Sequence, residues 1–549
     1  TTLNTLVLSI LFMLIGFSSW VVLPIRANAN PPINLNDPDN AIGMLDYYNR
    51  AQYGDWPVFY GANYTAYLDP NGITGMEDNG PIYEKDDKTG RYIVTGRRLN
   101  YTFNPAHVSI LPRMYNPDPG VMENYGLMEG YPDFTLSSQY IGHPEAEKIF
   151  EELQRKKREG EISISDYQTV KQNGLINVKK PTLGQNMDFM MTYQMGYMFI
   201  RYFLWNFAGR QNDLQGYYEN TKGNWISGIS FLDNARLGDQ SKLPAAYKNK
   251  ATNTYYFLPL LLGLIGFFLQ LNRDPGRNFG LIALFLLSSA GIILYTSIKA
   301  FEPRERDYAL VTSFYTFAIW IGLGVTAIML GLSKIKQNKV GLGIGFATLV
   351  IPVLVGFQNW DDHDRSRRYT AYDFSKSYVQ DLDKNNPILF VYGDNDTYPL
   401  WALQETEEFR SDTKIVNYTL LGTAWYIDQV LRKTYQAPGL PSSLTHEEYR
   451  DGVNDQVVLL NHDFWKQLFQ SIPTDSIPAN FAQFQKYAVQ DSLSAKEAIN
   501  FLKDKNAQNA AKELYTYVTE RDYSGTDVGF LPVDKIYIPV NKENAVKYK

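Results

Sequence analysis

The residues best suited to binding chemistry lie in a short charged segment, 301–308, which separates two long apolar stretches. It reads Phe-Glu-Pro-Arg-Glu-Arg-Asp-Tyr and places Arg304 and Arg306 beside the carboxylate of Asp307. Each guanidinium can donate two parallel hydrogen bonds to phosphate oxygens, so the pair is suited to hold a lipid-linked phosphate at a membrane surface. The same charges are also suited to an ion-pair network that fixes the turn. The sequence leaves both interpretations open.

A second candidate site, Gly-Asp-Asn-Asp-Thr at 393–397, follows the apolar segment 387–392. A loop directly after a parallel strand is where open α/β sheets place ligands. The carboxylates of Asp394 and Asp396 could therefore hold a hard divalent cation through oxygen ligands. The simpler interpretation, which we prefer, is an Asx-turn that caps the following helix. The spacing of the acids does not fit an EF-hand.

The aromatic segment 187–207 and the polar residues after it form a third candidate. Arg201 interrupts the apolar run, so we expect its guanidinium to face a polar partner and the segment to lie at the interface or pack against protein. A group of planar polar side chains surrounds the end of this segment: Asn206, Arg210, Gln211, Asn212 and Asp213. Beside Trp205 such groups suit a sugar, and ordinary loop capping explains them equally well.

The acidic run 361–364, Asp-Asp-His-Asp, is a weaker candidate for a metal ion or a general base. It directly follows an apolar stretch, where a polar collar at the membrane interface is the preferred interpretation. The chain has no Cys and only 5 His, which excludes thiol chemistry, disulfides and cysteine-based metal sites. There is no Walker loop, dinucleotide-binding glycine motif or nucleophile elbow. We assign no metal site and no catalytic residue, and a divalent cation at 393–397 is the one cofactor left open.

Five uncharged stretches must position these residues: 1–25, 251–272, 278–298, 309–333 and 340–360. Each supplies the roughly 20 apolar residues that cross about 30 Å of hydrocarbon as a helix. None shows the polar stripe of a buried soluble helix. The mean hydropathy of -0.30 hides this pattern, because the long segments between the stretches are polar. The expected fold class is a multi-pass α-helical membrane protein with five spans and two outer soluble segments.

Five spans place the segments 26–250 and 361–549 on the same side of the membrane, which is the outer side if the first span runs outward. The loops 273–277 and 334–339 then lie inside, and they are richer in Lys and Arg than the outer loop 299–308. This asymmetry favours the orientation by the positive-inside rule.

The two outer segments differ in their expected structure. Segment 26–250 alternates aromatic residues with Gly, Pro and Asp, which is typical of turns and short strands, and it contains a predicted helical hairpin at 144–174. Segment 361–549 alternates predicted helices and strands, which indicates a βαβ unit and a small α/β domain. Its first elements are expected as a helix at 370–384, a strand at 387–392, a helix at 399–409, a strand at 413–421 and a helix at 423–434.

The net charge, the aromatic content and the N-terminal stretch limit the possible classes of function further. The net charge of -6 gives no reason to expect a nucleic-acid partner. The 40 Tyr, 30 Phe and 9 Trp suit both membrane interfaces and carbohydrate-stacking surfaces. The first apolar stretch has no basic leader and no small-residue cleavage site, so it does not read as a signal peptide. We expect the chain to begin inside a larger protein.

Several stretches resemble a known family when they are taken together. They are IRANANPPINLNDPDN with YNRAQYGDWPVFYG, RYFLWNFAGRQND, PRERDYALVTSFYTFAIWIG, and HDRSRRYTAYDF with ILFVYGDNDTYPLWALQE. In this order they span nearly the whole chain and resemble the bacterial membrane proteins of glycosyltransferase family 117, which are described as protein O-mannosyltransferase-like.

The resemblance implies a GT-C-type enzyme that takes a sugar from a polyprenyl-phosphate donor at the outer face of the membrane and passes it to a protein or glycan acceptor. It also implies residence in the bacterial inner membrane, with the outer segments in the periplasm. In GT-C enzymes the catalytic acidic residue usually lies in an N-terminal membrane half, which we expect to precede Thr1.

The leading interpretation is the middle-to-C-terminal part of a membrane glycosyltransferase embedded in a lipid bilayer. The alternative is non-enzymatic, namely an envelope assembly or glycan-binding membrane protein. The candidate substrate-binding residues are Arg201, Arg210, Arg304, Arg306, Asp307, Asp394 and Asp396. The sugar, the acceptor and the oligomeric state are left open.

Overall fold

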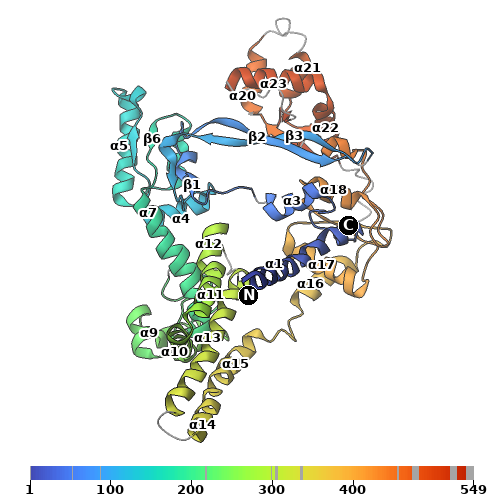
Figure 1. Cartoon of the computed structure of the whole chain (residues 1–549). Coiled ribbons are helices and arrows are strands. Elements are labelled where there is room, and N and C mark those ends of the chain that lie inside the picture. The colour runs from blue at the N-terminus through green and yellow to red at the C-terminus, as the bar shows by residue number, and fades with distance from the viewer. Residues whose placement is uncertain are drawn as a thin grey trace. The chain divides into compact units, whose positions relative to one another are not determined.

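The chain forms two compact units in the computed structural model. Unit 1 consists of Thr1–Gly54, Glu77–Asn100 and Tyr369–Lys549, and unit 2 consists of Asp55–Met76 and Tyr101–Arg368. The division falls within the long hairpin of β2 (Ile73–Lys85) and β3 (Tyr92–Phe103) (Figure 1). The structure describes residues 2–51, 54–86, 88–216, 219–297, 300–302, 307–333, 338–453, 457–460, 462–472, 481–519 and 528–539.

Apolar helices support the membrane character of the chain. Within the described residues, four helices are long and apolar enough to cross a membrane: Thr2–Asn28, Pro275–Thr296, Tyr308–Gly331 and Val340–His363. The helix α10 (Leu258–Arg273) is also apolar but shorter. The multi-pass prediction is therefore supported by four helices of membrane length, and the fifth expected span is not confirmed.

The predicted span 251–272 is shortened because its first residues form a strand. Asn253–Thr254 (β8) pairs antiparallel with Gly209–Arg210 (β7), so α10 begins only at Leu258. Its 16 residues rise about 24 Å, less than the roughly 30 Å of hydrocarbon. The absence of charge predicted a span, but the uncharged Asn253 and Thr254 pair with β7 as a strand instead.

Three of the four membrane-length helices are built from shorter elements, and the fourth is a single helix. They are α1 (Thr2–Ser18), the 3-10 turn Ser19–Val21 and α2 (Val22–Asn28); α11 (Pro275–Leu286), the π-helical turn Leu287–Gly291 and α12 (Ile292–Thr296); α13 (Asp307–Ser333); and α14 (Asn338–Thr348) with α15 (Val350–His363).

Glycines bring α10 and α13 together. A Cβ atom on Gly266 of α10 would lie 1.8 Å from the carbonyl oxygen of Trp320, and one on Gly324 of α13 would lie 2.0 Å from that of Leu262. Such close backbone approach through small residues is a common way for helices to associate in membranes. The shorter α10 therefore belongs to the same bundle as α13 (Figure 1).

Polar side chains join this bundle to α11. The indole nitrogen of Trp320 donates to Gln270 Oε1 at 2.9 Å and to Asn278 Oδ1 at 3.0 Å. These bonds satisfy the amide oxygens of the half-buried Gln270 and the buried Asn278, which would be costly to leave unpaired in an apolar environment.

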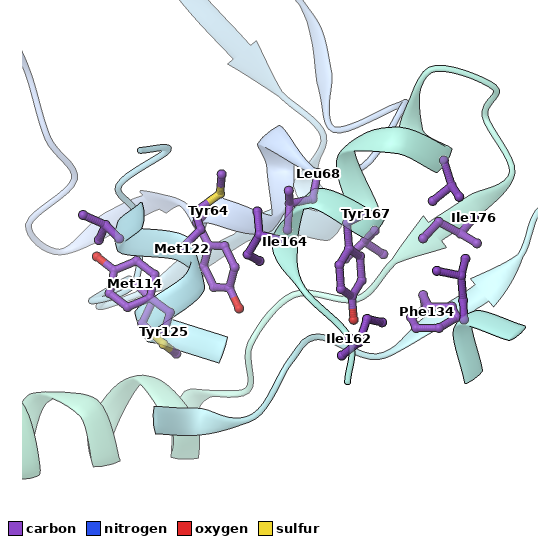
Figure 2. Packing of buried hydrophobic residues seen from close by; sticks show 14 of the residues in the cluster. Tyr64, Leu68, Met114, Met122, Tyr125, Phe134, Ile162, Ile164, Tyr167 and Ile176 are labelled. Atoms are coloured by element: carbon purple, nitrogen blue, oxygen red, sulfur yellow. The ribbon is translucent and has the colours of Figure 1, made fainter. Parts of the chain in front are cut away.

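The rest of unit 2 packs short helices and two-stranded sheets around an apolar core. Tyr64, Leu68, Tyr125, Tyr167 and Ile176 lie at its centre (Figure 2). The antiparallel strand pairs are β1 (Tyr60–Ala62) with β4 (Val108–Ile110) and β5 (Phe134–Leu136) with β6 (Ile176–Val178). The helices are α4 (Pro119–Glu129), α5 (Pro144–Glu159), α6 (Ile164–Lys171), α7 (Leu183–Phe189), α8 (Tyr202–Phe207) and α9 (Ser230–Leu237). The helices α5 and α6 confirm the helical hairpin predicted at 144–174.

Unit 1 contains the predicted βαβ unit. The strands β9 (Ile388–Val391) and β10 (Lys414–Asn417) pair in parallel, and α17 (Asp394–Glu407) connects them. The alternation of elements along the sequence predicted this arrangement correctly. The neighbouring helices are α3 (Ala41–Asn49), α16 (Thr370–Gln380), α18 (Ala424–Leu431) and α19 (His446–Tyr449).

A second core in unit 1 holds the C-terminal elements, with Trp465, Phe484 and Phe501 among its buried side chains. The strands pair in parallel, β11 (Val457–Leu459) with β13 (Gly529–Leu531) and β12 (Leu493–Ser494) with β14 (Ile536–Tyr537). The helices are α20 (His462–Ser471), α21 (Ala482–Ala488), α22 (Ala495–Lys503) and α23 (Lys505–Thr519). Short 3-10 turns elsewhere in the chain lie at Tyr64–Tyr67, Pro105–His107, Ser138–Tyr140, Gln240–Lys242, Ala245–Tyr247 and Tyr418–Leu420.

Candidate functional site

Two of the predicted substrate-binding residues, Arg201 and Arg210, lie together over the indole ring of Trp205. The distances from the guanidinium carbons to the ring centroid are 4.5 Å and 4.4 Å. The guanidinium of Arg201 also lies 3.8 Å from the ring centroid of Tyr197. We call Tyr197, Arg201, Trp205 and Arg210 the arginine–tryptophan cluster. A cation over an aromatic face is stabilised by about 2 kcal/mol when it is desolvated.

A four-residue spacing along one helical segment positions this cluster. The π-helix η6 (Met190–Arg201) continues from α7 into α8. Phe189, Tyr193 and Tyr197 stack in turn, with ring centroids 5.1 Å and 5.5 Å apart, and Arg201 and Trp205 extend the series. Because the hydrogen bonds of a π-helix join residues i and i+5, each turn holds more than four residues. Side chains four residues apart therefore stay near one face. The spacing of these five residues is a sequence signal that we overlooked.

Arg201 is buried and bound by the protein itself. It is 6% exposed, and it donates from Nη1 to the carbonyl oxygen of Gly223 at 2.8 Å and from Nε to that of Tyr197 at 3.0 Å. The expectation that Arg201 faces polar partners is therefore confirmed. Among the described residues, the segment 187–207 is also not one of the helices apolar enough to cross a membrane.

Arg210 is the more accessible of the two arginines. Its side chain is half-buried, and Nε donates to the carbonyl oxygen of Asn212 at 3.2 Å. It lies on β7, so the pairing with β8 holds its backbone in place. The guanidinium combines a fixed charge with further N–H donors, which is the chemistry that binds phosphate or carboxylate oxygens.

The amide side chains of Gln211 and Asn212 build the loop that surrounds Arg201. Asn212 donates to the carbonyl oxygens of Thr221 at 2.9 Å and Tyr247 at 3.1 Å, and its Oδ1 accepts from the backbone of Gly223 at 2.9 Å. Gln211 is likewise buried. These bonds use most of the hydrogen-bonding capacity that a sugar would need, which favours the loop-building interpretation for these two residues.

The cluster adjoins the end of the membrane-length helix α15. The backbone nitrogen of Thr254 in β8 donates to Gln358 Oε1 at 2.7 Å, and Asn359 Nδ2 donates to the hydroxyl of Tyr255 at 2.5 Å. Burial raises the pKa of this hydroxyl, Asp362 raises it further, and Asn359 and Arg210 oppose the rise. Arg210 and Asp362 therefore act on the same hydroxyl, beside the end of α15.

The structure corrects our preferred interpretation of Asp394 and Asp396. The helix α17 begins at Asp394 and has Gly393 as its N-cap, with no side-chain capping bond, so there is no capping Asx-turn. The two carboxylates lie in the first turn, where the helix dipole stabilises negative charge. In the described part of the chain, no group of three or more acidic, His or Cys side chains could hold a metal ion. The divalent cation, which would need the amide oxygen of Asn395 beside the two carboxylates, stays a prediction.

The remaining predicted residues lie at the loop before α13. Arg304 and Arg306 fall outside the residues that the structure describes, and of Asp307 it describes only the backbone as the first residue of α13. Both interpretations of this loop, a phosphate site and an ion-pair network, stay as predictions.

Sequence analysis missed a strained acidic loop after the first apolar helix. The residues Asn36 and Asp37 have φ angles of 61° and 36°, in the left-handed region that non-glycine residues rarely adopt. Burial raises the pKa of the Asp37 carboxyl to about 6, and nearby Asp39 adds to the rise while Arg432 opposes it. Asn and Asp tolerate this backbone conformation best, so the Asn-rich composition was the available signal.

A histidine network was also missed. His446 lies between two carboxylates, with Nδ1 3.0 Å from Asp428 Oδ1 and Nε2 2.8 Å from Glu84 Oε1. The bonds to Asp428 and Glu84 raise the pKa of His446 to about 9, against the effect of burial. The imidazole is therefore charged at neutral pH. Its partners come from α18 and β2, so no local spacing could predict this network.

Two family models match parts of the chain. Residues 371–549 match TMEM260-associated domain 2, and residues 54–191 match a family of unknown function, DUF8416. The first match contains the β9–α17–β10 unit, and the second contains most of the core of unit 2. No curated protein and no solved structure matches the chain. The chain therefore combines helices of membrane length with a region similar to TMEM260-associated domain 2.

Proposed function

We propose that this chain is part of an integral-membrane glycosyltransferase that takes its sugar from a polyprenyl-phosphate donor at the outer face of the membrane. The observation that carries the proposal is the combination of four membrane-length helices with a region similar to TMEM260-associated domain 2. TMEM260 is described as an O-mannosyltransferase-like membrane protein. The resemblance of the sequence motifs to protein O-mannosyltransferase-like proteins points to the same reaction class.

In this proposal the arginine–tryptophan cluster serves the donor. Arg210 is half-buried, and apart from Nε its N–H groups have no hydrogen-bond partner among the described residues, so it binds the phosphate. The buried Arg201 holds Trp205 in place. One charge-assisted contact to a phosphate contributes about 1.5–3 kcal/mol. Arg304 and Arg306 are a second candidate pair for the same anion.

The acceptor in this proposal is a protein or a glycan on the outer side of the membrane. For a bacterial protein this places both outer segments in the periplasm and the helices in the inner membrane. We assign no catalytic base to the described residues.

The test is sugar transfer by the full-length protein that contains this chain, reconstituted in proteoliposomes. We expect transfer from polyprenyl-phosphate mannose, and none from GDP-mannose, because the proposed donor is lipid-linked. Parallel assays use polyprenyl-phosphate glucose and N-acetylglucosamine, since the sugar is not specified. Failure with all three lipid-linked donors, together with retained glycan binding, would contradict the proposal and favour a non-enzymatic glycan-binding protein.

A further inference from the structure

Two exposed tyrosines lie side by side at the carboxyl ends of β9 and β10. Tyr392 follows β9 and Tyr418 follows β10, and the register pairs the preceding residues, Val391 and Asn417. The ring centroids are 6.3 Å apart and the ring planes differ by 28°. Their exposed fractions are 72% and 64%. We call this pair the tyrosine platform.

The platform continues an exposed apolar stripe on β9. Alternate residues of a strand share a face, so Ile388, Phe390 and Tyr392 lie on one side. The exposed fractions of Ile388 and Phe390 are 42% and 57%, whereas Val391 on the other face is buried. An ordered row of exposed apolar side chains, in contrast to scattered single ones, marks an interaction surface.

Polar groups with unused hydrogen-bonding capacity border the platform. Asp394, Asn395 and Asp396 follow Tyr392 after Gly393. Their side chains have no hydrogen-bond or ion-pair partner among the described residues, and Asp394 and Asn395 are exposed. Behind Tyr418, Asn417 is 1% exposed, and its Nδ2 has no partner within the described part of the chain. The carboxyl edge of a parallel strand pair is also where α/β sheets bind ligands.

The mixture of groups selects one class of ligand. A lipid tail or an apolar peptide segment would bury the carboxylates of Asp394 and Asp396 without partners, which is unfavourable. A phosphate or an anionic lipid headgroup would be repelled by the same two charges. A pyranose ring fits both features, because its C–H face stacks on an aromatic ring while its hydroxyls donate to carboxylate and amide oxygens.

We propose that the carboxyl edge of β9 and β10 is a carbohydrate-binding site. Tyr392 and Tyr418 form the stacking surface, and Asp394 and Asn395 bind the sugar hydroxyls. The proposal gives Asp394, one of the candidate substrate-binding residues, a role that needs no metal ion. It rests on the proposed function only in assigning the bound sugar to the acceptor glycan.

The test is disaccharide binding to the full chain in detergent micelles, measured by saturation-transfer NMR and calorimetric titration. The probes are α-1,2-mannobiose, cellobiose and chitobiose. We expect one of them to bind, and Tyr392→Ala and Tyr418→Ala each to weaken binding at least tenfold. Tyr392→Trp restores the stacking surface and is expected to bind as the wild type does, and Asp394→Asn is expected to weaken binding several-fold.

A matched control separates stacking from a general loss of aromatic surface. Tyr369 is another tyrosine of unit 1 with a 59% exposed side chain, so Tyr369→Ala is expected to bind sugar normally. The replaced platform rings are exposed, so the thermal midpoint is expected to stay unchanged in each variant.

Three results would overturn the inference. The first is that the wild type binds none of the probes. The second is that both alanine variants bind sugar as the wild type does. The third is that the alanine variants keep sugar binding and lose binding to phosphatidylglycerol vesicles. Because no transfer is measured, a failure of the proposed enzymatic function leaves this result unaffected. A transferring enzyme whose tyrosine variants bind sugar normally would overturn this inference alone.

Discussion

The arginine–tryptophan cluster of unit 2 and the tyrosine platform of unit 1 both place aromatic rings beside charged residues. In the cluster, the rings and Arg201 are buried, and backbone carbonyl oxygens accept from the guanidinium. At the platform, both rings are exposed, and the neighbouring carboxylates have no partner among the described residues. Aromatic and charged side chains therefore stabilise the fold in one region and face solvent in the other. Burial and hydrogen-bond saturation distinguish the two uses.

The largest expected effect is on the buried arginine. Arg201→Ala removes a cation from between two rings and leaves the carbonyl oxygen of Gly223 without this donor. We expect the free energy of unfolding to fall by about 3 kcal/mol. Arg236→Ala is the control, because Arg236 also lies over an indole, that of Trp225, but is exposed. Denaturant titrations that show equal losses for both variants would contradict the distinction drawn from burial.

The packing of α10 against α13 is expected to affect stability nearly as much. Gly324→Ala would place a Cβ atom 2.0 Å from the carbonyl oxygen of Leu262 and force α10 and α13 apart. We expect a loss of about 2 kcal/mol, seen as a lowered thermal midpoint in micelles. Gly322→Ala on the same helix meets no atom within 4 Å and serves as the control. A midpoint for Gly324→Ala as high as that of the control would show that the two helices do not pack as described.

The histidine network of unit 1 lies between the two cases in exposure, and it is expected to make stability depend on pH. The pKa of His446 rises from 6.5 to about 9 in the folded state. The contribution of the charged imidazole to the free energy of unfolding is therefore complete below about pH 6.5 and is lost as the pH rises through about 9. Because the side chain is 39% exposed, we expect only about 1–2 kcal/mol.

Unfolding measured between pH 6 and pH 10 checks this expectation. His446→Gln is expected to remove the dependence, and His143→Gln, at an exposed histidine, is expected to keep it. An identical pH profile for wild type and His446→Gln would show that another group is responsible.

The smallest expected effect on stability is at the platform. Tyr392→Ala replaces a ring that is 72% exposed, so the free energy of unfolding is expected to change by no more than about 0.5 kcal/mol. A larger loss in a denaturant titration would mean that the ring supports the fold, and the contrast with Arg201 would fail.

Local patterns predicted those parts of the fold that depend on neighbours in sequence. Uncharged runs identified the membrane-length helices, and the alternation of strands and helices identified the β9–α17–β10 unit. The start of α10 was wrong because β7 supplies a strand partner from a distant part of the chain to Asn253 and Thr254. A pattern of uncharged residues cannot show such a partner.

In the candidate sites, too, only features that depend on nearby residues in the sequence could be predicted. The cost of burying an unpaired charge predicted that Arg201 faces polar groups. The network of His446 could not be predicted, because Glu84 and Asp428 lie far apart in sequence and meet only in the fold. The capping role of Asp394 was wrong because the preceding Gly393, with a φ angle of 78°, takes the N-cap position.

The most direct test of the proposed glycosyltransferase is the affinity of the intact protein for a polyprenyl phosphate, measured together with the thermal midpoint. The account predicts that Arg210→Lys weakens binding about ten- to a hundred-fold, because a lysine keeps the charge but loses the planar donor fork. Arg304→Lys and Arg306→Lys are measured in parallel, and Arg236→Lys is expected to bind as the wild type does. Unchanged affinity in all of the first three variants, with a lowered midpoint, would contradict a donor site and leave these arginines with a structural role.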